Sequence, residues 1–534
     1  MVDENSILIG KSQDAFEKIL LKYANRHGLI AGATGTGKTV TLQVLAEGFS
    51  NAGVPVFAAD IKGDLSGIAA NGEAKAPFVK RAEEIGIEYV PDRFPTVFWD
   101  IFGEQGHPVR STVTEMGPIL LSRMLELNDT QEGVLNIAFK VADDNGLPLL
   151  DMKDLRSILN FLVEQAAEVK EKYGNVTKDS VATILRRLLV LENQGAEHFF
   201  GEPALNINDF MHVDRDGRGV VNILAADKLM TKPRLYASFL LWMLSSLFEA
   251  LPEVGDPEKP KLVFFFDEAH LLFNDAPKAL LTSIEQVVRL IRSKGVGVYF
   301  VTQNPVDIPE TVLAQLGNRV QHALRAFTPR DQKAVRAAAE TFRKNPEFST
   351  EQAITQLAVG EALVSTLDDK GTPTVVQRTL IAPPSGRVGP LTDAERAALI
   401  KSSGLMGRYE EAFDRESAYE MLIERAELAA QEQDSENSGG GITGWLGSIL
   451  GINLGGGTPA KRGPGRPRMT VSETVIRSTT TSVANSVGRE IGKVLTGSTS
   501  TRKGASITDK AIQSATSSAV RAIVRNILGG LTKK

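Results

Sequence analysis

The sequence has no cysteine, few histidines and no long apolar run. Without cysteine, the chain of 534 residues can form no disulfide, no cysteine-ligated zinc site and no thiol nucleophile, which fits a reducing cytoplasm. The six histidines include no His-x-x-x-His pair, so we expect no structural metal site. No stretch reaches the roughly 18 apolar residues of a membrane span, and the start lacks the features of a secretory signal. We therefore expect a cytoplasmic protein, with association with the nucleoid or a membrane left open.

The formal net charge of −5 conceals an asymmetry between the body of the chain and its end. Residues 438–534 carry 14 Lys or Arg against three acidic residues, a surplus of +11 that leaves −16 for the rest of the chain. An acidic body with a basic tail suggests that the tail is a separate interaction element. The alternative is a solvated tail that only keeps the protein soluble.

Short apolar runs alternate with helical patterns along the body of the chain. Continuous apolar runs of this length are typical of strands buried on both faces, as in a parallel sheet. Helical patterns such as 38–50 and 276–293 follow them, and this alternation predicts a doubly wound α/β sheet. The clearest predicted strands are Leu29–Ala31, Val56–Ala59, Leu262–Phe266 and Val298–Thr302.

The strongest motif is Gly32-Ala-Thr-Gly-Thr-Gly-Lys-Thr39, which fits G-x-x-x-x-G-K-[ST] between a predicted strand and a predicted helix. Glycines let backbone N–H groups curl around phosphate oxygens, and the helix N-terminus adds a positive dipole end. Lys38 is expected to reach the β- and γ-phosphates of ATP, and the Thr39 hydroxyl to bind Mg²⁺. The predicted nucleotide-binding residues are Gly32, Ala33, Thr34, Gly35, Thr36, Gly37, Lys38, Thr39, Val40 and Asp267.

A second motif, a Walker B pattern, is the apolar run 261–266 followed by Asp267 and Glu268. We expect Asp267 to hold Mg²⁺ through water and Glu268 to polarise the attacking water, which distinguishes a hydrolase from a mere binder. A third polar group, Gln303, follows the run 298–302 and is predicted to sense the γ-phosphate. Strand-end capping is the alternative role for Gln303.

Arginines near the predicted strands could complete such a site. Arg289 and Arg292 lie three apart before the run 298–302, and Arg26 precedes the P-loop strand. Ring ATPases place an arginine of one subunit against the γ-phosphate bound by the next, where it stabilises charge in the transition state. A solvated ion pair is the alternative for each arginine.

Together these residues resemble the HerA/FtsK class of ring-forming P-loop translocases, and most closely the bacterial HerA-like proteins of unknown function. The resemblance runs from about Arg26 to Arg387. Its more specific part is Arg292-Ser-Lys-Gly-Val-Gly running into Thr302-Gln-Asn-Pro305. The other matching segments are Arg26-His27, Ala59-Asp-Ile-Lys-Gly-Asp64, Asp267-Glu-Ala-His270 and Val359-Gly-Glu-Ala-Leu-Val364.

The resemblance implies a RecA-like fold, a hexameric ring and movement of duplex DNA through its pore. It also implies Lys38 and Thr39 on nucleotide and Mg²⁺, Glu268 as catalytic base and Gln303 as sensor. Arg292 and Arg26 would then act in trans. The resemblance does not extend to the N-terminal β-barrel of HerA proteins, because only about 27 residues precede the P-loop strand.

The end of the chain falls outside this resemblance to HerA. Residues 461–468 look like an AT-hook, a basic element for the A·T minor groove, or else form a plain basic linker. Ala515, Ala519, Ile523, Ile527 and Leu531 recur every four residues beside basic side chains. Such a stripe could dock on protein or bind an anionic membrane surface.

We therefore predict a RecA-like α/β P-loop NTPase sheet with a helical insertion and a flexible basic C-terminal tail. The predicted function is an ATP-hydrolysing, Mg²⁺-dependent ring motor that translocates duplex DNA. The alternative is an ATPase that remodels protein or membrane-associated assemblies without DNA. The predicted domains are the first part of the core (1–104), the insertion (105–235), the second part of the core (236–390), a helical extension (391–433) and the tail (434–534).

Overall fold

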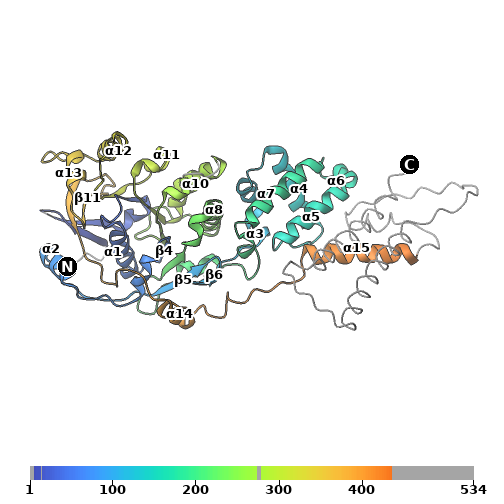
Figure 1. Cartoon of the computed structure of the whole chain (residues 1–534), viewed down its shortest axis with the longest axis horizontal. Helices are drawn as coiled ribbons and strands as arrows, with labels where there is room; N and C mark the ends of the chain where they lie inside the picture. Colours follow the sequence, from blue (N-terminus) through green and yellow to red (C-terminus); the bar gives the residue numbers. More distant parts are fainter. Residues whose placement is uncertain (1–4, 14, 274–277, 436–534) are drawn as a thin grey trace, which may run out of the picture. The chain divides into compact units, whose positions relative to one another are not determined.

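The computed structural model describes residues 5–13, 15–273 and 278–435. The chain separates into two compact units (Figure 1). The first unit comprises Met1–Asn128 and Arg186–Asp414, and the second comprises Asp129–Leu185 and the residues from Arg415 on. The predicted tail, apart from its first two residues, lies outside the described part of the chain.

One sheet forms the centre of the first unit, with the strand order β2-β1-β12-β11-β10-β3-β9-β8-β4-β7-β5-β6 among the described residues. Every neighbouring pair from β10 to β6 is parallel. The pairs from β2 to β10 are antiparallel. The strands are β1 (Ser6–Lys11), β2 (Phe16–Leu20), β3 (Gly28–Ala31), β4 (Val56–Asp60), β5 (Thr96–Asp100), β6 (His107–Pro108), β7 (Val221–Ala225), β8 (Leu262–Phe266), β9 (Val296–Thr302), β10 (Asn318–Gln321), β11 (Glu361–Ser365) and β12 (Gln377–Ile381).

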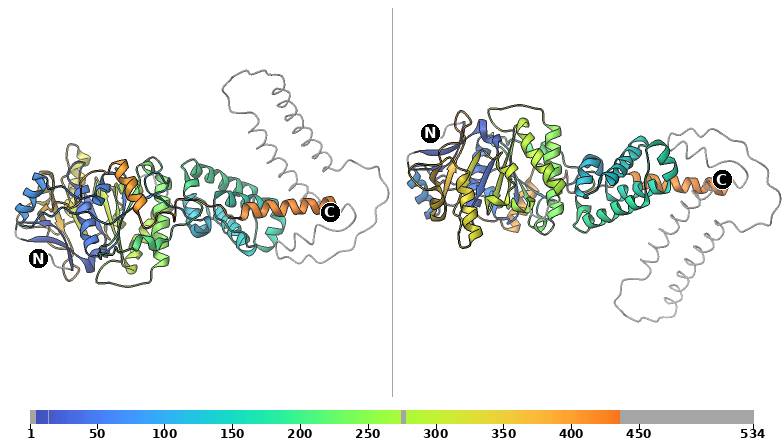
Figure 2. Two further views of the ribbon diagram at one scale, coloured as in Figure 1. Left: turned by 90° about the horizontal axis from the view of Figure 1, so that it is seen from below. Right: turned by 90° about the horizontal axis from the view of Figure 1, so that it is seen from above.

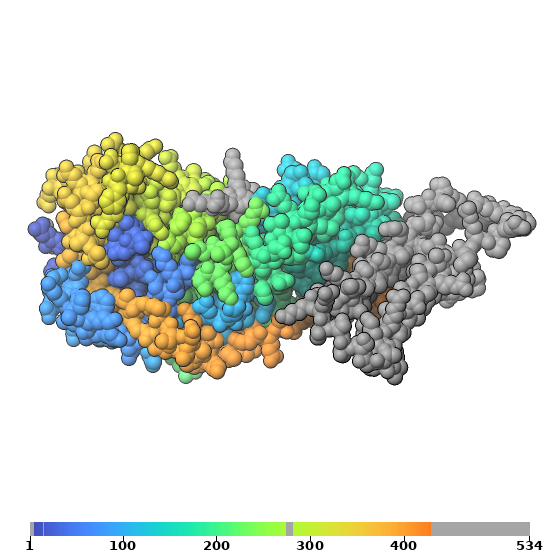
Figure 3. Space-filling model, in the orientation of Figure 1, coloured from blue at the N-terminus to red at the C-terminus, as the bar shows by residue number. Residues whose placement is uncertain are grey.

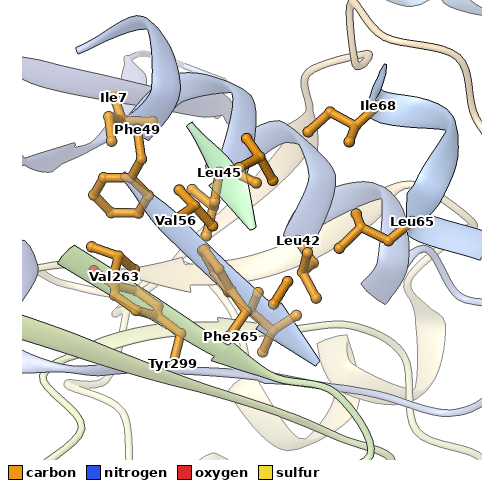
Figure 4. Close-up of a cluster of buried hydrophobic side chains, with 14 of the residues drawn as sticks. Ile7, Leu42, Leu45, Phe49, Val56, Leu65, Ile68, Val263, Phe265 and Tyr299 are labelled. Atoms are coloured by element: carbon orange, nitrogen blue, oxygen red, sulfur yellow. The ribbon is translucent and has the colours of Figure 1, made fainter. Parts of the chain in front are cut away.

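Helix α1 packs the main core of the first unit against one face of this sheet (Figure 4). The Phe49 ring lies 5.8 Å from the Tyr299 ring and 6.1 Å from the Phe265 ring, centroid to centroid. This packing fixes α1 relative to β8 and β9. The helices of the first unit are α1 (Lys38–Asn51), α2 (Ala76–Ile85), α3 (Val113–Met124), α8 (Pro233–Ala250), α9 (His270–Phe273), α10 (Lys278–Ile291), α11 (Glu310–Leu313), α12 (Pro329–Glu340), α13 (Thr350–Gln356) and α14 (Asp393–Ser402).

The opposite face of the sheet is also apolar, because side chains alternate between the two faces of a strand. Phe266 lies 5.8 Å from Phe264 and 5.7 Å from Phe300, ring centroid to ring centroid. Burial on both faces explains why these strands are continuous apolar runs in the sequence.

Helix α14 packs against β5 near one edge of the sheet. The Arg396 guanidinium lies over the Phe98 ring at 4.8 Å, and it donates a hydrogen bond to the Gln105 carbonyl at 3.4 Å. Figure 3 shows the orange surface of this segment beside light-blue residues of the first unit. Helix α14 thereby covers part of β5, the strand that contains Phe98.

The second unit is helical. The carboxylate of Asp154 accepts hydrogen bonds from the Ser417 hydroxyl at 2.5 Å and the Tyr419 N–H at 2.8 Å, which joins α5 to the start of α15. Both views of Figure 2 show α15, in orange, beside the teal helices. These helices are α4 (Asp129–Asp144), α5 (Met152–Glu164), α6 (Ala166–Lys172), the first part of α7 (Lys178–Glu192) and α15 (Ala418–Ser435). No helix in the described ranges combines the length and apolar character needed to cross a membrane.

The α/β sheet predicted from the sequence is confirmed, and its four clearest strands are β3, β4, β8 and β9. Strands β11 and β12 form an antiparallel hairpin, which turns where the Gly371 N–H donates to the Asp368 carbonyl at 2.8 Å. Strand β7 lies within 105–235, where the sequence shows few strand signals. The predicted domain bounds stay a prediction.

Candidate nucleotide-binding and hydrolysis site

The P-loop connects β3 to α1 and has a backbone that requires glycine. Gly32 and Gly37 adopt φ of +156° and +114°, conformations that L side chains rarely adopt. A Cβ at Gly32 would lie 2.5 Å from the Cβ of His322, closer than such atoms approach. The loop can therefore pass close to a ligand and present N–H groups, which is what a phosphate cradle needs.

Lys38 begins α1 and lies over this loop. Its ammonium donates to the Ala33 carbonyl at 3.1 Å, and the Thr36 hydroxyl donates to the same oxygen at 2.7 Å. Burial lowers the pKa of Lys38, whereas the charge of Glu268 opposes that effect. A buried cation above a glycine cradle fits the phosphates of ATP, so the residues present fit the predicted nucleotide.

The strand order brings the second and third motifs to the P-loop. Strand β9 lies between β3, which leads into the P-loop, and β8, which leads into Asp267 and Glu268. All three strands are parallel, so the residues that follow them share one edge of the sheet. Asp267, Glu268 and Gln303 are therefore together at the P-loop edge, as their positions in the sequence predict.

Glu268 is the most enclosed of these groups, with a side chain only 4% exposed. The Lys62 ammonium donates to its Oε1, and the Gln303 amide donates to its Oε2 at 3.1 Å. Burial alone would raise the pKa of Glu268, but the hydrogen bonds from Lys62 and Gln303, with the charges of Lys62 and His270, lower it below the usual value. Glu268 is therefore a carboxylate at neutral pH, the form a general base needs.

The backbone at Glu268 is also unusual. Its φ of +47° is in the left-handed region, which a residue with a long side chain rarely occupies. Such conformations persist where the surrounding structure enforces them, often at functional sites. Here the Glu268 N–H donates to the Asp267 carboxylate at 2.9 Å. The strained turn therefore lies at the point where the acidic pair follows β8.

Asp267 and Thr39 are the candidate ligands of Mg²⁺. Burial, and then the charge of Glu268, raise the pKa of Asp267 to about 6. A divalent cation would favour the charged form of a carboxylate in this position. Thr39 follows Lys38 in the first turn of α1, on the P-loop side of the sheet. This donor set of one buried carboxylate and one hydroxyl fits a magnesium ion that keeps several waters.

The two candidate arginines lie at the amino ends of the parallel strands, opposite the ends that carry the P-loop site. Arg26 ends the 3₁₀ helix η1 (Leu21–Arg26) before β3, and Arg292 begins η6 (Arg292–Lys294) before β9. Both guanidinium groups pair with the Asp256 carboxylate, at 3.4 Å and 3.1 Å. Both precede parallel strands whose carboxyl ends lead to the P-loop site, so the length of a strand separates each arginine from the nucleotide site of its own subunit. Their action on a neighbouring subunit stays a prediction.

Two groups beside the P-loop were not predicted from the sequence. His322 donates through Nδ1 to the Glu361 carbonyl at 3.0 Å, so its Nε2 accepts from the Thr41 hydroxyl at 2.8 Å. Burial lowers the pKa of His322 to about 4, so it is neutral. The Gly360 N–H donates to the Thr36 carbonyl at 3.2 Å. These contacts join residues far apart in the sequence, so no local motif could reveal them.

Lys62 was also not predicted as a site residue. It lies in a segment shared with HerA-like proteins, but the sequence alone indicates no role for it. It follows β4, and the Asp60 carboxylate shapes its loop by accepting hydrogen bonds from the N–H groups of Gly63 at 2.8 Å and Leu65 at 3.2 Å. Burial, with the charges of Asp64 and Asp267, raises the pKa of Asp60 to about 7. The structure thus adds a second lysine to the predicted site.

Comparison with known proteins agrees with this geometry. The family described as Helicase HerA-like C-terminal matches residues 5–504. The chain belongs to this family. At the level of the family it is therefore a P-loop ATPase, which confirms the predicted family, fold class and enzyme class.

Individual relatives of this HerA-family chain are distant. The DNA double-strand break repair helicase HerA of Sulfurisphaera tokodaii is 23% identical over 368 residues, which cover 68% of this chain and 67% of that protein. The probable helicase MJECL08 of Methanocaldococcus jannaschii is 33% identical over 125 residues, or 23% of this chain and 22% of that protein. The bacterial conjugative coupling protein TrwB, a solved structure, is 16% identical with a TM-score of 0.45, covering 69% of this chain and 90% of that chain.

Proposed function

We propose that this HerA-family ATPase assembles into a hexameric ring in the cytoplasm and uses ATP hydrolysis to move duplex DNA through its pore. One observation carries the proposal. The candidate hydrolysis site lies at the carboxyl ends of the parallel strands, and the paired arginines Arg26 and Arg292 lie at their amino ends. A site completed by a neighbour's arginine needs subunits arranged head to tail, and such contacts form a ring when the rotation between subunits closes. The DNA substrate is supported by the distant relatives described as HerA helicases.

Within each site, the loop from Gly32 to Val40 would wrap the phosphates. Lys38 would neutralise the β- and γ-phosphates, and Thr39 and Asp267 would hold Mg²⁺, which spreads the charge that develops on the phosphates. Glu268 would take a proton from the attacking water, since its carboxylate is ionised and lies on the P-loop side of the sheet.

The remaining predicted residues would detect and stabilise the γ-phosphate. Gln303 is exposed and already donates to Glu268, so it can report the terminal phosphate to the base. Arg292, with Arg26 beside it, would reach the γ-phosphate bound by the adjacent subunit and stabilise transition-state charge.

A second candidate function is remodelling of protein or membrane-associated assemblies through the tail, without DNA. The net charge of −16 outside residues 438–534 favours it, because an acidic surface repels the DNA backbone. A narrow pore, however, needs only a few basic residues. The tail itself lies outside the described residues, so its AT-hook and docking interpretations stay predictions.

The ATPase rate with and without duplex DNA distinguishes the two candidates. We expect duplex DNA to raise the rate severalfold at about 50 mM salt, and the stimulation to decline towards about 200 mM, because phosphate contacts weaken as salt rises. Lys38→Ala, measured in parallel, controls for contaminating ATPases. A rate that duplex DNA leaves unchanged at every salt concentration would favour the second function.

A further inference from the structure

We propose that Lys62 is a phosphate-responsive lock on Glu268: it holds the carboxylate until the γ-phosphate of ATP takes over its ammonium group. The inference rests on the proposed role of Glu268 as catalytic base. It assigns a function to a lysine outside the P-loop, on the loop that follows β4.

The position of Lys62 beside the base follows from the sheet. Strands β4 and β8 are parallel neighbours, with Ala59 opposite Phe266. The residues that follow the two strands therefore lie side by side, and the Lys62 ammonium donates to the Oε1 of Glu268. Asp60 keeps the backbone of this loop in place through its two accepted hydrogen bonds.

The contacts of Glu268 leave it poorly placed to accept a proton from water. Lys62 holds one carboxylate oxygen, and Gln303 donates to the other at 3.1 Å. Only 4% of the Glu268 side chain is exposed. With the carboxylate enclosed and a donor on each oxygen, withdrawal of one donor would open room for an attacking water to donate to the base.

Of the two donors, both of which reach solvent, Lys62 is the one whose positive charge a phosphate would attract. Its side chain is 41% exposed, about ten times the exposed fraction of the Glu268 side chain. An ammonium group on a four-carbon stem can change partners while the backbone stays fixed. A fixed backbone with a flexible ammonium group would let Lys62 alternate between two anionic partners.

The second partner is expected at the P-loop. Lys62 contacts Glu268, which follows β8, and β8 is separated from the P-loop strand β3 only by β9, so the ammonium lies at the ends of the strands that carry the P-loop. Its positive charge also lowers the pKa of Lys38. A γ-phosphate there carries more negative charge than a carboxylate and would compete for Lys62. ADP lacks this group, so ATP and ADP would differ in releasing the base.

Nucleotide binding to Lys62→Met tests the phosphate contact. We expect the affinity for a non-hydrolysable ATP analogue to fall about tenfold, the worth of one charge-assisted hydrogen bond, with ADP affinity unchanged within about twofold. Lys62→Arg should restore most of the analogue affinity, because it keeps a cation. Lys80→Met, an exposed lysine on α2, is the matched control. Equal losses for both nucleotides, or none, would overturn the proposal.

Competition between phosphate and carboxylate is tested by combining Lys62→Met with Glu268→Gln. Glu268→Gln alone frees Lys62, so it should tighten analogue binding about threefold or more. The gain should disappear when Lys62 is also replaced by methionine. If the gain persists in the double variant, simple charge repulsion explains it and Lys62 is no lock.

The hydrolysis rates distinguish failure of the proposed lock role of Lys62 from failure of the proposed role of Glu268 as catalytic base. Should Glu268→Gln remain active, the proposed base is wrong. Should Glu268→Gln be inactive while Lys62→Met binds ATP analogue and ADP as the wild type does, the base stands and only the lock is wrong. If Lys62→Met does not fold, as judged by thermal unfolding, Lys62→Gln supplies the same comparison.

Discussion

Glu268→Gln is expected to bind ATP at least as tightly as the wild type and to lose hydrolysis by about 10²- to 10⁴-fold, the usual contribution of general base catalysis. The amide keeps the size and the acceptor oxygen of the side chain, so Gln303 retains a partner. It cannot take a proton from water. Steady-state phosphate release, together with nucleotide binding by fluorescence, measures both halves of this expectation.

Two further variants serve as controls for Glu268→Gln. Lys38→Ala should weaken nucleotide binding itself, because it removes the cation over the P-loop. Glu73→Gln, an exposed carboxylate paired with Lys75 at 3.5 Å, should leave the rate unchanged. Near-normal turnover by Glu268→Gln would remove Glu268 from the chemistry and shift attention to Asp267.

Arg292→Ala is expected to lower hydrolysis by about 10³-fold or more, as loss of an arginine finger does, while the subunit stays folded and binds ATP. Its guanidinium pairs with the exposed Asp256 at 3.1 Å, and exposed ion pairs contribute little to stability. Arg336→Ala is the matched control: Arg336 also pairs with an exposed carboxylate, Glu351, at 3.9 Å, and it has no assigned role in the site.

Mixing Arg292→Ala with Glu268→Gln subunits tests whether the arginine acts in trans. Each variant alone should be inactive. In random equal mixtures about one interface in four would combine an intact base with an intact neighbouring arginine, because head-to-tail contacts join different surfaces. Activity should therefore partly return. No recovery, with subunit exchange demonstrated by differently labelled chains, would argue for a role within one subunit or for none.

The sequence predicts the parts of this site that depend on local patterns. The P-loop glycines, Lys38 and the acidic pair 267–268 each follow or precede a strand-like run, and parallel strands bring such positions to one edge. Gln303 was predicted on the same basis, and the structure places its amide against Glu268.

Other features depend on which strands become neighbours, and no local pattern sets that. The contact of Lys62 with Glu268 requires β4 beside β8, and the pairing of Arg26 and Arg292 with Asp256 joins three distant segments. Strands β1 and β2 extend the sheet on its antiparallel side, although the sequence before the P-loop gives only short apolar runs. Contacts between such distant segments can be identified only from the three-dimensional structure.

Movement along duplex DNA is measured most directly by displacement of a third strand bound to the duplex. The wild-type chain with ATP and Mg²⁺ should displace a triplex-forming oligonucleotide at a rate that depends on hydrolysis. Glu268→Gln, which is expected to bind ATP without turnover, should leave the triplex intact. ATP hydrolysis by the wild type with no displacement, on duplexes long enough to pass through a ring, would contradict the proposed translocation.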